Sequence, residues 1–495
     1  MPGASVLTDS YKAGHFTQYP ETDKMCAYGE FRCGYDGDAA DTRLVSYGVR
    51  YVVQNFVQRQ WTLRDVEQAE AFYSQHLAPM NTAYPYPKDL FRKVVTEHGG
   101  YLPVTLQALP EGTCVNAHVP VYQITAEGEF AYLATFLETL LTMVWYPSTV
   151  ATLSRRAKDV IEAAFRKSVS DDSFFLLPSR LHDFGFRGCC TAEQSVIGGC
   201  AHLLNFEGSD TMSACYYAQF VLNGGKPVAS SIPATEHSVM TSWKNEQLAI
   251  ENMIEKYGSG LFACVMDSYD YMHALTEILP AVAEKKVEKG GYMVLRPDSG
   301  DPVDCVLKAL EAADKVFGSD VNDKGFKVIK GCGVIQGDGV NIAKITNILD
   351  AALAAGYSAQ NIAFGMGGGL LQKLNRDTMS FATKLNYIRY ADGEERAIMK
   401  APKTDTGKYS LPGVLSVFRV DGVPTVFPAG QGPAGAEDLL QVVYDKGPVA
   451  GMEWDDFSAV RERVNAEWGA LPKAADPLSA ELKALITALN PHLKV

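Results

Sequence analysis

The chain has 495 residues, 47% of them hydrophobic, and a formal net charge of −13. This length exceeds one ordinary core and favours two or three domains of a globular protein. The negative charge argues against a general nucleic-acid binder, because phosphate backbones are held by basic surfaces. Any anion site must therefore be a local basic pocket.

Cysteine usage and the amino terminus indicate a compartment. The ten cysteines form no C-x-x-C pair and no Cys/His set with metal-ligand spacing. Most stand in apolar segments such as FACVMD, which is typical of buried thiols in a reducing environment. MPGASVLTDSYK lacks the basic and apolar regions of a secretion signal, and no apolar run suits a membrane span. We expect a cytoplasmic protein without membrane association.

Residues 1–150 mix two periodicities, which predicts the first part of an α+β domain. Segments 47–56 and 66–76 have helical spacing, whereas 104–109 and 119–125 alternate as antiparallel strands. The apolar stretch 131–143 predicts a buried helix that stops at Trp145-Tyr146-Pro147.

Between residues 151 and 386 seven strand-like runs recur, with helical patterns such as 236–257 and 303–316 among them. Each run ends in polar or glycine residues; they are LHDFGFRG (181–188), LLNFEGSD (203–210), VASSIPATEHS (228–238), FACVMDS (262–268), YMVLRPDSG (292–300), VIQGDG (334–339) and IAFGMGGG (362–369). This alternation predicts an irregular parallel β/α barrel within an α/β protein.

Polar side chains gather where these predicted strands end. Barrel strands are buried on both faces, so their carboxyl ends are where polar groups meet a ligand. The ends carry Asp183, Arg187, Asp210, His237, Asp267, Arg296, Asp298, Asp338 and the glycines 367 to 369. Such a set favours a binding site over a series of solvated turns.

Two successive glycine turns follow the last two strands, Gly337-Asp338-Gly339 and the glycines from Gly367. Glycine lets backbone N–H groups approach an anion closely, and a following helix adds the positive end of its dipole. Parallel strands also end in glycine for turn geometry alone. Two neighbouring turns nevertheless favour a ligand with two phosphate groups.

Residues 387–495 have a different character. Segments 387–390, 397–400 and 414–420 read as short strands, and the last 45 residues read as peripheral helices. We expect this segment to return and complete the sheet of the α+β domain.

These motifs, in their order, carry a family resemblance. TDSYK (8–12), VWYP (144–147), LHDFGFRG, SIPATEHS, RPDSG, IQGDGV and IAFGMGGGLLQKLNRD are together similar to the nicotinamide branch of the type II pyridine phosphoribosyltransferases. A single GDG or GGG motif is weak evidence for a family. The full set of motifs is highly specific and covers nearly the whole chain. The resemblance implies transfer of phosphoribosyl from 5-phosphoribosyl-1-pyrophosphate to nicotinamide, giving nicotinamide mononucleotide and pyrophosphate in NAD salvage.

The resemblance also assigns roles to residues. It implies that Phe184 and Tyr11 stack on the two faces of the pyridine ring, with Tyr11 and Asp9 supplied by the second subunit of a homodimer. Asp210 would accept a hydrogen bond from the carboxamide, and Arg187 would lie near the amide. The remaining ligand contacts would come from Arg296, Asp298, Gly337 and Asp338 for ribose and pyrophosphate, and from Gly367, Gly368, Arg376, Lys384, Arg32 and Lys400 for the 5′-phosphate.

Two further groups are implied by the family. His237 matches a histidine that ATP phosphorylates, which raises catalytic efficiency without being chemically required. Mg²⁺ would bridge pyrophosphate oxygens, with Asp267 and Asp298 near it, since a hard ion prefers oxygen ligands.

The sequence departs from the family at two places and leaves rivals open. Phe186 stands where other members often have Tyr, and residues 33–46 are shorter than usual, which affects the alignment of Arg32. The nearest rival is a nicotinate phosphoribosyltransferase. The others are a phosphosugar lyase or isomerase barrel, which would want a lysine at a strand end, and a non-catalytic secreted signalling protein.

Overall fold

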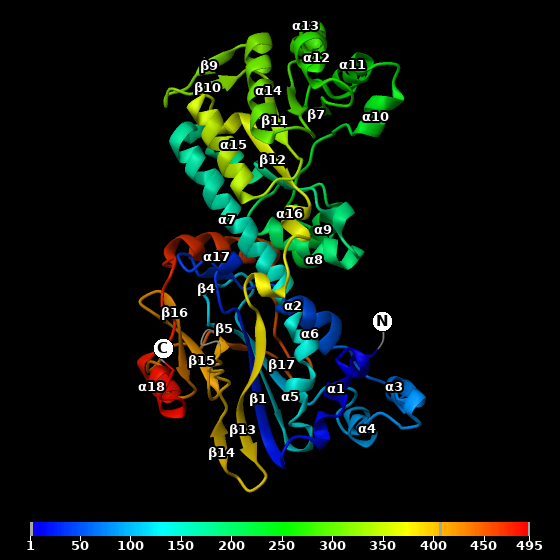
Figure 1. Ribbon diagram of the computed structural model, residues 1–495, viewed down its shortest axis with the longest axis vertical. Coiled ribbons are helices and arrows are strands. Elements are labelled where there is room, and N and C mark those ends of the chain that lie inside the picture. The colour runs from blue at the N-terminus through cyan, green and yellow to red at the C-terminus, as the bar shows by residue number, and fades with distance from the viewer. Residues whose placement is uncertain (1–2, 405–407, 494–495) are drawn as a thin grey trace. The chain divides into compact units, whose positions relative to one another are not determined.

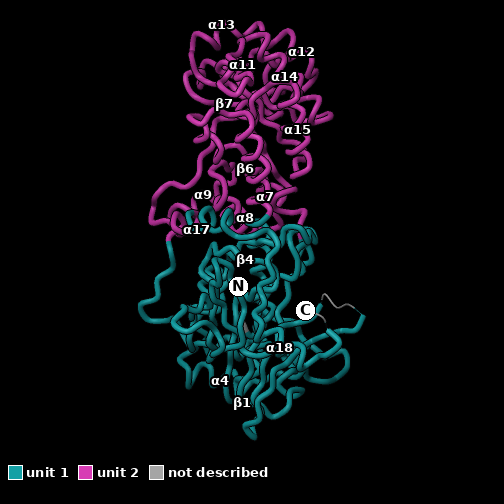
Figure 2. The backbone as a smooth tube through the Cα atoms, turned by 90° about the vertical axis from the view of Figure 1, so that its left-hand side faces the viewer, with its two compact units in different colours: residues 1–152, 375–455, 462–495 teal, residues 153–374, 456–461 magenta. Residues whose placement is uncertain are grey.

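The computed structural model describes residues 3–404 and 408–493, which form two compact units (Figures 1 and 2). Unit 1 holds residues 1–152, 375–455 and 462–495, and unit 2 holds residues 153–374 and 456–461. Every helix of the described residues is too short or too polar to cross a bilayer.

The units differ from the expected division at 150 and 386 in three segments, the shortest of which is residues 151–152 in unit 1. Residues 375–386 lie in unit 1, because they lead into a strand that pairs with the amino-terminal strand of that unit. Residues 456–461 lie in unit 2, where the Arg461 guanidinium donates to the carbonyl oxygens of Leu203 (2.8 Å) and Val228 (2.6 Å).

Unit 1 is built on a six-stranded sheet in which every neighbouring pair is antiparallel. Its strands, in spatial order, are β14 (Glu395–Ala397), β13 (Ala382–Tyr390), β1 (Thr22–Glu30), β5 (Pro120–Glu127), β3 (Val104–Ala108) and β17 (Gln441–Asp445). Three of the six come from the carboxyl-terminal part of the chain. The expected α+β domain of amino- and carboxyl-terminal segments is therefore confirmed.

Short strands and helices complete unit 1. The strands pair as β2 (Arg43–Val45) with β4 (Cys114–Asn116) and β15 (Leu415–Val420) with β16 (Val423–Pro428). The helices are α1 (Ser10–Ala13), α2 (Val49–Val52), α3 (Leu63–His76), α4 (Lys88–Thr96), α5 (Leu133–Phe136), α6 (Glu138–Thr142) and α18 (Ala480–Leu489), with the start of α7 (Trp145–Ser168) and most of α17 (Phe457–Ala470).

The prediction that a helix over 131–143 stops at Trp145-Tyr146-Pro147 is corrected by the structure. The stretch 131–143 forms α5 and α6, and α7 begins at Trp145 and continues through Pro147. Proline is tolerated in the first turn of a helix, because the N–H groups there have no partner within the helix. Proline therefore marks the beginning of α7 and not the end of the helix before it.

Unit 2 contains a five-stranded parallel sheet that curls. Its strands, in spatial order, are β6 (Leu181–Asp183), β12 (Ile362–Met366), β11 (Cys332–Gln336), β8 (Tyr292–Arg296) and β7 (Leu261–Val265). Isolated parallel bridges join Asp183 to Ser209, Gly208 to Ser230, and Ala234 to Ala263. The two edges of the sheet are thereby linked through two extended segments, which confirms an irregular parallel barrel.

Helices alternate with these strands as expected. They are α8 (Ala192–Leu203), α9 (Met212–Tyr217), α10 (His237–Ser242), α11 (Glu246–Tyr257), α12 (Tyr271–His273), α13 (Leu279–Lys289), α14 (Pro302–Phe317), α15 (Ile342–Ala354) and α16 (Gly368–Leu371), beside a small hairpin of β9 (Ser319–Val321) and β10 (Lys327–Ile329). The strand expected over 203–210 is shorter, because α8 extends to Leu203 and bridges form at Gly208 and Ser209 alone.

Candidate active site

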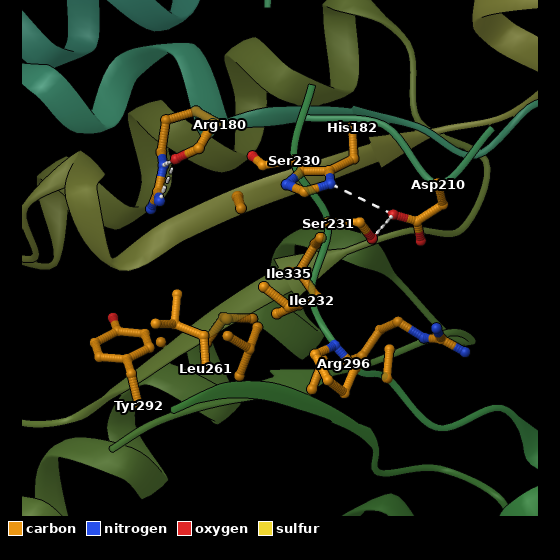
Figure 3. A pocket seen from close by; sticks show the side chains of 18 of the residues that line it. Arg180, His182, Asp210, Ser230, Ser231, Ile232, Leu261, Tyr292, Arg296 and Ile335 are labelled. Atoms are coloured by element: carbon orange, nitrogen blue, oxygen red, sulfur yellow. Dashed lines mark hydrogen bonds and ion pairs between the residues drawn. The ribbon is translucent and has the colours of Figure 1, made fainter. Parts of the chain in front are cut away.

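A cavity of about 450 Å³ occupies the barrel of unit 2, and Asp210 lies in its wall (Figure 3). Phe184 lines the same cavity. The ring of Phe184 packs on the neighbouring strand, where a Cβ at Gly365 would lie 2.0 Å from its Cε2 atom. A Cβ at Gly337 would lie 3.2 Å from the same atom. Glycine at these two positions therefore makes room for a half-buried aromatic platform.

The Asp210 carboxylate is held from two sides. Its Oδ1 atom accepts a hydrogen bond from Ser231 Oγ at 2.8 Å, and His182 Nδ1 lies 3.6 Å from the same oxygen (Figure 3). The backbone N–H of Asp210 donates to the carbonyl oxygen of Asp183 at 3.0 Å, which fixes the strand end. The other carboxylate oxygen is not used in these contacts, so Asp210 can accept a hydrogen bond from a ligand.

Asp183, beside Phe184, is an acid held within the fold. Its Oδ1 atom accepts a hydrogen bond from the Gly185 N–H at 2.7 Å. No hydrogen-bond partner is found for Oδ2 among the described residues. Burial raises the pKa of Asp183 to about 6, against the lowering effect of the hydrogen bond from the Gly185 N–H. Asp183 thus stabilises the turn that carries Phe184 and Arg187.

Four sequence-predicted catalytic residues meet at the ends of β7 and β8. His237 Nε2 lies 3.4 Å from Asp298 Oδ2 and 3.9 Å from Asp267 Oδ1. Its other ring nitrogen is hydrogen-bonded to Ser268 Oγ at 3.1 Å. Arg296 Nη2 lies 3.9 Å from Asp298 Oδ2. The histidine side chain is 46% exposed and Asp267 only 4%, so an accessible imidazole faces a buried carboxylate.

Asp267 organises the loop after β8. Its Oδ2 atom accepts hydrogen bonds from the Asp298 N–H at 3.0 Å and from the Ser299 hydroxyl. Among the described residues Asp267 Oδ1 and Arg296 Nε are buried and have no hydrogen-bond partner. A buried polar atom without a partner costs free energy unless a ligand satisfies it. Asp267 Oδ1 is therefore suited to accept from a ligand or to bind a hydrated cation, and Arg296 Nε is suited to donate to an anionic ligand.

The two glycine turns also lie together. Gly339 adopts a left-handed φ of 58°, and Asn341 caps α15 by accepting from the Lys344 N–H at 2.9 Å. A Cβ at Gly369 would lie 2.4 Å from the Val340 carbonyl oxygen, so the second turn packs against the first. Gln372 Nε2 donates to the Gly185 carbonyl at 3.0 Å and ties this loop to the turn after Phe184.

Apart from Arg187, the remaining predicted ligand residues lie in unit 1. Tyr11 is 55% exposed on α1, and its hydroxyl donates to Asp9 Oδ2 at 3.2 Å. Lys12 anchors the same helix, since its Nζ donates to Glu138 Oε2 at 2.7 Å and to the Thr135 carbonyl at 3.1 Å. This helix therefore presents an aromatic ring outward on a fixed base.

Basic side chains gather on the same unit. Burial lowers the pKa of Lys384; Glu138 opposes this, whereas Arg32 and Lys400 lower the pKa further. Arg376 lies in an exposed 3₁₀ turn, with Nη2 3.4 Å from Asp377 Oδ1. Arg32, Lys384 and Lys400 therefore form a cationic cluster suited to an anion. We call these three residues the cationic cluster.

Sequence patterns alone did not identify the residues that support these groups. Ser231, Ser268 and Glu138 orient Asp210, His237 and Lys12, respectively, through single hydrogen bonds. The first two stand inside recognised motifs, which is the one available signal. Arg187 is exposed in the 3₁₀ turn 186–188, which directly follows the Phe184 strand end.

Comparisons with known proteins agree with this fold. Residues 179–447 match the nicotinate phosphoribosyltransferase (NAPRTase) family, and residues 4–106 match the nicotinamide phosphoribosyltransferase amino-terminal domain. In structure the chain is similar to human nicotinic acid phosphoribosyltransferase, with a TM-score of 0.60 at 18% identity, covering 98% of this chain and 100% of that one. A nicotinate-nucleotide pyrophosphorylase from Pyrococcus furiosus gives 0.61 at 16% identity, covering 94% and 95%.

Curated relatives are more similar in sequence. A nicotinamide phosphoribosyltransferase of Xanthomonas campestris pv. campestris (strain 8004) is 42% identical over 421 residues, 83% of this chain and 86% of that protein. One of Acinetobacter baylyi (strain ATCC 33305 / BD413 / ADP1) is 30% identical over 480 residues, 89% and 93% of the two chains. The chain belongs to the nicotinate phosphoribosyltransferase family and is a phosphoribosyltransferase related to the nicotinamide enzymes.

Proposed function

We propose that the chain transfers the phosphoribosyl group of 5-phosphoribosyl-1-pyrophosphate to nicotinamide, giving nicotinamide mononucleotide and pyrophosphate in NAD salvage. The observation that carries this proposal is the pairing of Phe184 with Asp210 in one cavity wall, an aromatic platform beside a carboxylate acceptor. A flat ring with an amide donor at its edge matches that pair.

The reaction requires little acid–base catalysis from the protein. The pyridine nitrogen already carries a lone pair, so the site has to align it with the anomeric carbon and stabilise the charge that develops. Phe184 orients the ring, and Asp210 fixes its rotation through the amide. Arg296 carries positive charge beside Asp298 at the strand ends, where it would stabilise the departing pyrophosphate.

The activating metal is proposed as Mg²⁺ beside Asp267 and Asp298. No group of three metal-ligating side chains is found among the described residues, so the protein would offer these carboxylates and leave the other positions to phosphate oxygens and water. The unpartnered, buried Asp267 Oδ1 fits such a role. Bound there, the ion would neutralise charge on pyrophosphate.

ATP is proposed as an activator that phosphorylates His237. The imidazole is exposed, and Ser268 orients it, so one ring nitrogen is accessible beside two carboxylates. A negatively charged phosphohistidine at this place would alter the electrostatics of the Asp267 and Asp298 loop, which is how it would affect binding of the donor.

The proposed assembly is a homodimer with shared active sites. Glu138 influences the pKa of both Tyr11 and Lys384, so both side chains lie near Glu138 in unit 1. A neighbour that supplies Tyr11 and Asp9 therefore also supplies the cationic cluster for the 5′-phosphate. We further propose a cytoplasmic location, which suits buried thiols such as Cys264, whose pKa burial raises to about 12.

The proposal is tested by incubating the purified chain with donor, nicotinamide, Mg²⁺ and ATP, and identifying the product by mass spectrometry. Nicotinamide mononucleotide should form, and Arg296→Ala should lower kcat/KM by about 10²-fold or more, since one charge-stabilising group is typically worth that much. Lys330→Ala, which removes an exposed cation elsewhere in unit 2, serves as the control. Absence of the nucleotide with folded protein would contradict the proposal.

A further inference from the structure

Glu30 is a fully buried carboxylate whose two oxygens have different partners. Its Oε1 atom accepts hydrogen bonds from the Tyr28 hydroxyl at 2.9 Å and from Arg32 Nε at 3.2 Å. Its Oε2 atom lies 3.2 Å from His118 Nδ1. Burying a charge costs free energy unless it is paired and hydrogen-bonded, so all three partners help to hold this carboxylate in one orientation.

Arg32 has a hydrogen-bond donor that no described residue uses. Its side chain is 9% exposed, and Glu30 uses its Nε, whereas Nη2 is buried without a hydrogen-bond partner among the described residues. The Arg32 guanidinium and Lys400 both lower the pKa of Lys384. An unsatisfied guanidinium donor within a cationic cluster is the arrangement that a phosphate group satisfies.

His118 stands in an unusual backbone conformation. Its φ is 73°, in the left-handed region that a residue with a Cβ adopts only at a steric cost. Its N–H donates to the Phe31 carbonyl at 2.7 Å, and its ring stacks on Tyr409 with centroids 5.1 Å apart and planes 19° apart. Glycine would take this conformation without strain, so the strain accompanies contacts that only the imidazole makes.

We propose that His118 is a positioning residue that fixes Arg32 for the 5′-phosphate of the donor, acting through Glu30. With Nδ1 protonated, the imidazole donates to Oε2, which turns Oε1 toward Arg32 Nε and leaves the Nη groups of Arg32 for the ligand. This inference rests on the proposed function, because the phosphate that Arg32 would bind is that of the phosphoribosyl donor.

The test replaces His118 by glycine in the full chain and separates stability from donor binding. Glycine relieves the strain at this φ, whereas loss of the imidazole leaves the buried Glu30 Oε2 without this partner, so the melting temperature should fall by no more than a few degrees. The KM for the donor should rise about threefold to tenfold, as expected for the indirect loss of part of a charged hydrogen bond. The nicotinamide KM and kcat should stay within about twofold of wild type, since the altered contact is to the donor alone.

A double-mutant cycle shows whether the effect passes through Arg32. Arg32→Ala should raise the donor KM further than His118→Gly, and adding His118→Gly to Arg32→Ala should change it less than about twofold, because coupled residues are non-additive. Equal effects in both backgrounds, an unchanged donor KM in His118→Gly, or a general loss of stability and all kinetic constants would each overturn the proposal.

The outcome for the wild type separates this inference from the function on which it rests. Calorimetric titration with 5-phosphoribosyl-1-pyrophosphate shows whether the wild-type chain binds the donor. If it binds and turns over the donor while His118→Gly does so equally well, the role of His118 alone is wrong. If the wild type neither binds nor uses the donor, the proposed function itself is wrong, and the inference falls with it.

Discussion

Among single residues, Asp210 is the group that we propose distinguishes an amide from a carboxylate. Nicotinamide presents an NH₂ donor to it, whereas nicotinate would place a second negative charge beside it. A charge-assisted hydrogen bond is worth about 1.5–3 kcal/mol and like-charge juxtaposition costs several more, which corresponds to roughly 10²–10⁴-fold discrimination. Asp210→Asn and Asp210→Ser should therefore weaken nicotinamide use and admit nicotinate, with Arg187 as its partner.

Competition between the two acceptors measures this preference. Ser231→Ala, which removes the hydroxyl that donates to Asp210 Oδ1 at 2.8 Å, should shift the preference less far in the same direction. Asp392→Asn, on an exposed turn of unit 1, should leave it unchanged. Wild-type protein that uses both acceptors equally, or variants with the wild-type preference, would show that Asp210 is not the selector.

His237 is predicted to carry the ATP effect and not the transfer itself. His237→Ala should abolish ATP hydrolysis and the stimulation of synthesis by ATP, while ATP-independent transfer remains, because the donor already carries its leaving group. The measurement is ATP consumed per nucleotide formed. A variant that still hydrolyses ATP in step with synthesis would remove His237 from this role.

The raised pKa of Asp183 predicts that the stability of the protein depends on pH. Burial raises its pKa in the folded protein to about 6 from a usual 3.8, so the folded state holds the proton more tightly than the unfolded state. Its contribution is therefore most favourable at low pH and is lost as pH rises from about 4 to 6, by roughly 1–3 kcal/mol.

Calorimetric melting temperatures of the wild type and Asp183→Asn check this prediction across that range. The asparagine keeps an oxygen for the Gly185 N–H and does not titrate. The difference between the two proteins should move in favour of the variant as pH rises from 4 to 6 and level off above. A difference that is constant with pH would mean that Asp183 titrates like a solvated carboxylate.

Residue types at strand ends could be predicted from sequence, whereas their supporting partners could not. His237, Asp267, Arg296 and Asp298 follow apolar runs, and the structure brings them together. His118 offers no such signal. Its contact with Glu30 joins residues 88 positions apart, and a positive φ at a histidine cannot be predicted from local composition.

At the level of elements, the ring of Phe184 depends on the strand beside it. Gly365→Ala should destabilise unit 2 and raise the nicotinamide KM at least tenfold, because a Cβ there would lie 2.0 Å from the Phe184 ring and overpacking is costly. Gly469→Ala in α17 is the matched control: no atom lies within 4 Å of its Cβ, so it should be neutral or stabilising.

Thermal melts and nicotinamide KM values of both variants check this prediction. A Gly365→Ala protein with wild-type stability and KM would show that Phe184 moves aside freely and is no fixed platform.

The hydrophobic runs predicted the existence of the strands better than the regularity of each strand. Five of the seven expected strands form the parallel sheet, and the segments around Ser209 and Ser230 complete the ring through single bridges. Bridges of this kind depend on pairing across the barrel, which local pattern does not encode. The prediction that a helix ends at Pro147 was wrong for a related reason. The effect of this proline depends on whether a helix ends or begins there.

For the whole molecule, shared active sites predict complementation between inactive subunits. Tyr11→Ala lies in unit 1 and Arg296→Ala in unit 2, so a hybrid dimer would contain one intact site. Random exchange of equal amounts should restore about a quarter of wild-type activity, since half of the dimers are hybrids with one working site of two. Confirmed hybrids without activity would argue that each chain builds its own site.

The control pairs two variants of the same unit. Tyr11→Ala mixed with Lys384→Ala should restore nothing, because both residues belong to unit 1 and in the proposed dimer one neighbour would supply both of them. Activity in this mixture would mean that Tyr11 and the cationic cluster serve different sites.

The central claim is the transfer of phosphoribosyl to nicotinamide, and pyrophosphate release tests it most directly. Wild-type protein is supplied with 5-phosphoribosyl-1-pyrophosphate and Mg²⁺, together with nicotinamide, nicotinate or no acceptor. The account predicts release that depends on nicotinamide, is at least roughly 10²-fold faster than with nicotinate, and is matched mole for mole by nicotinamide mononucleotide. Release that is independent of the acceptor, or faster with nicotinate, would contradict it.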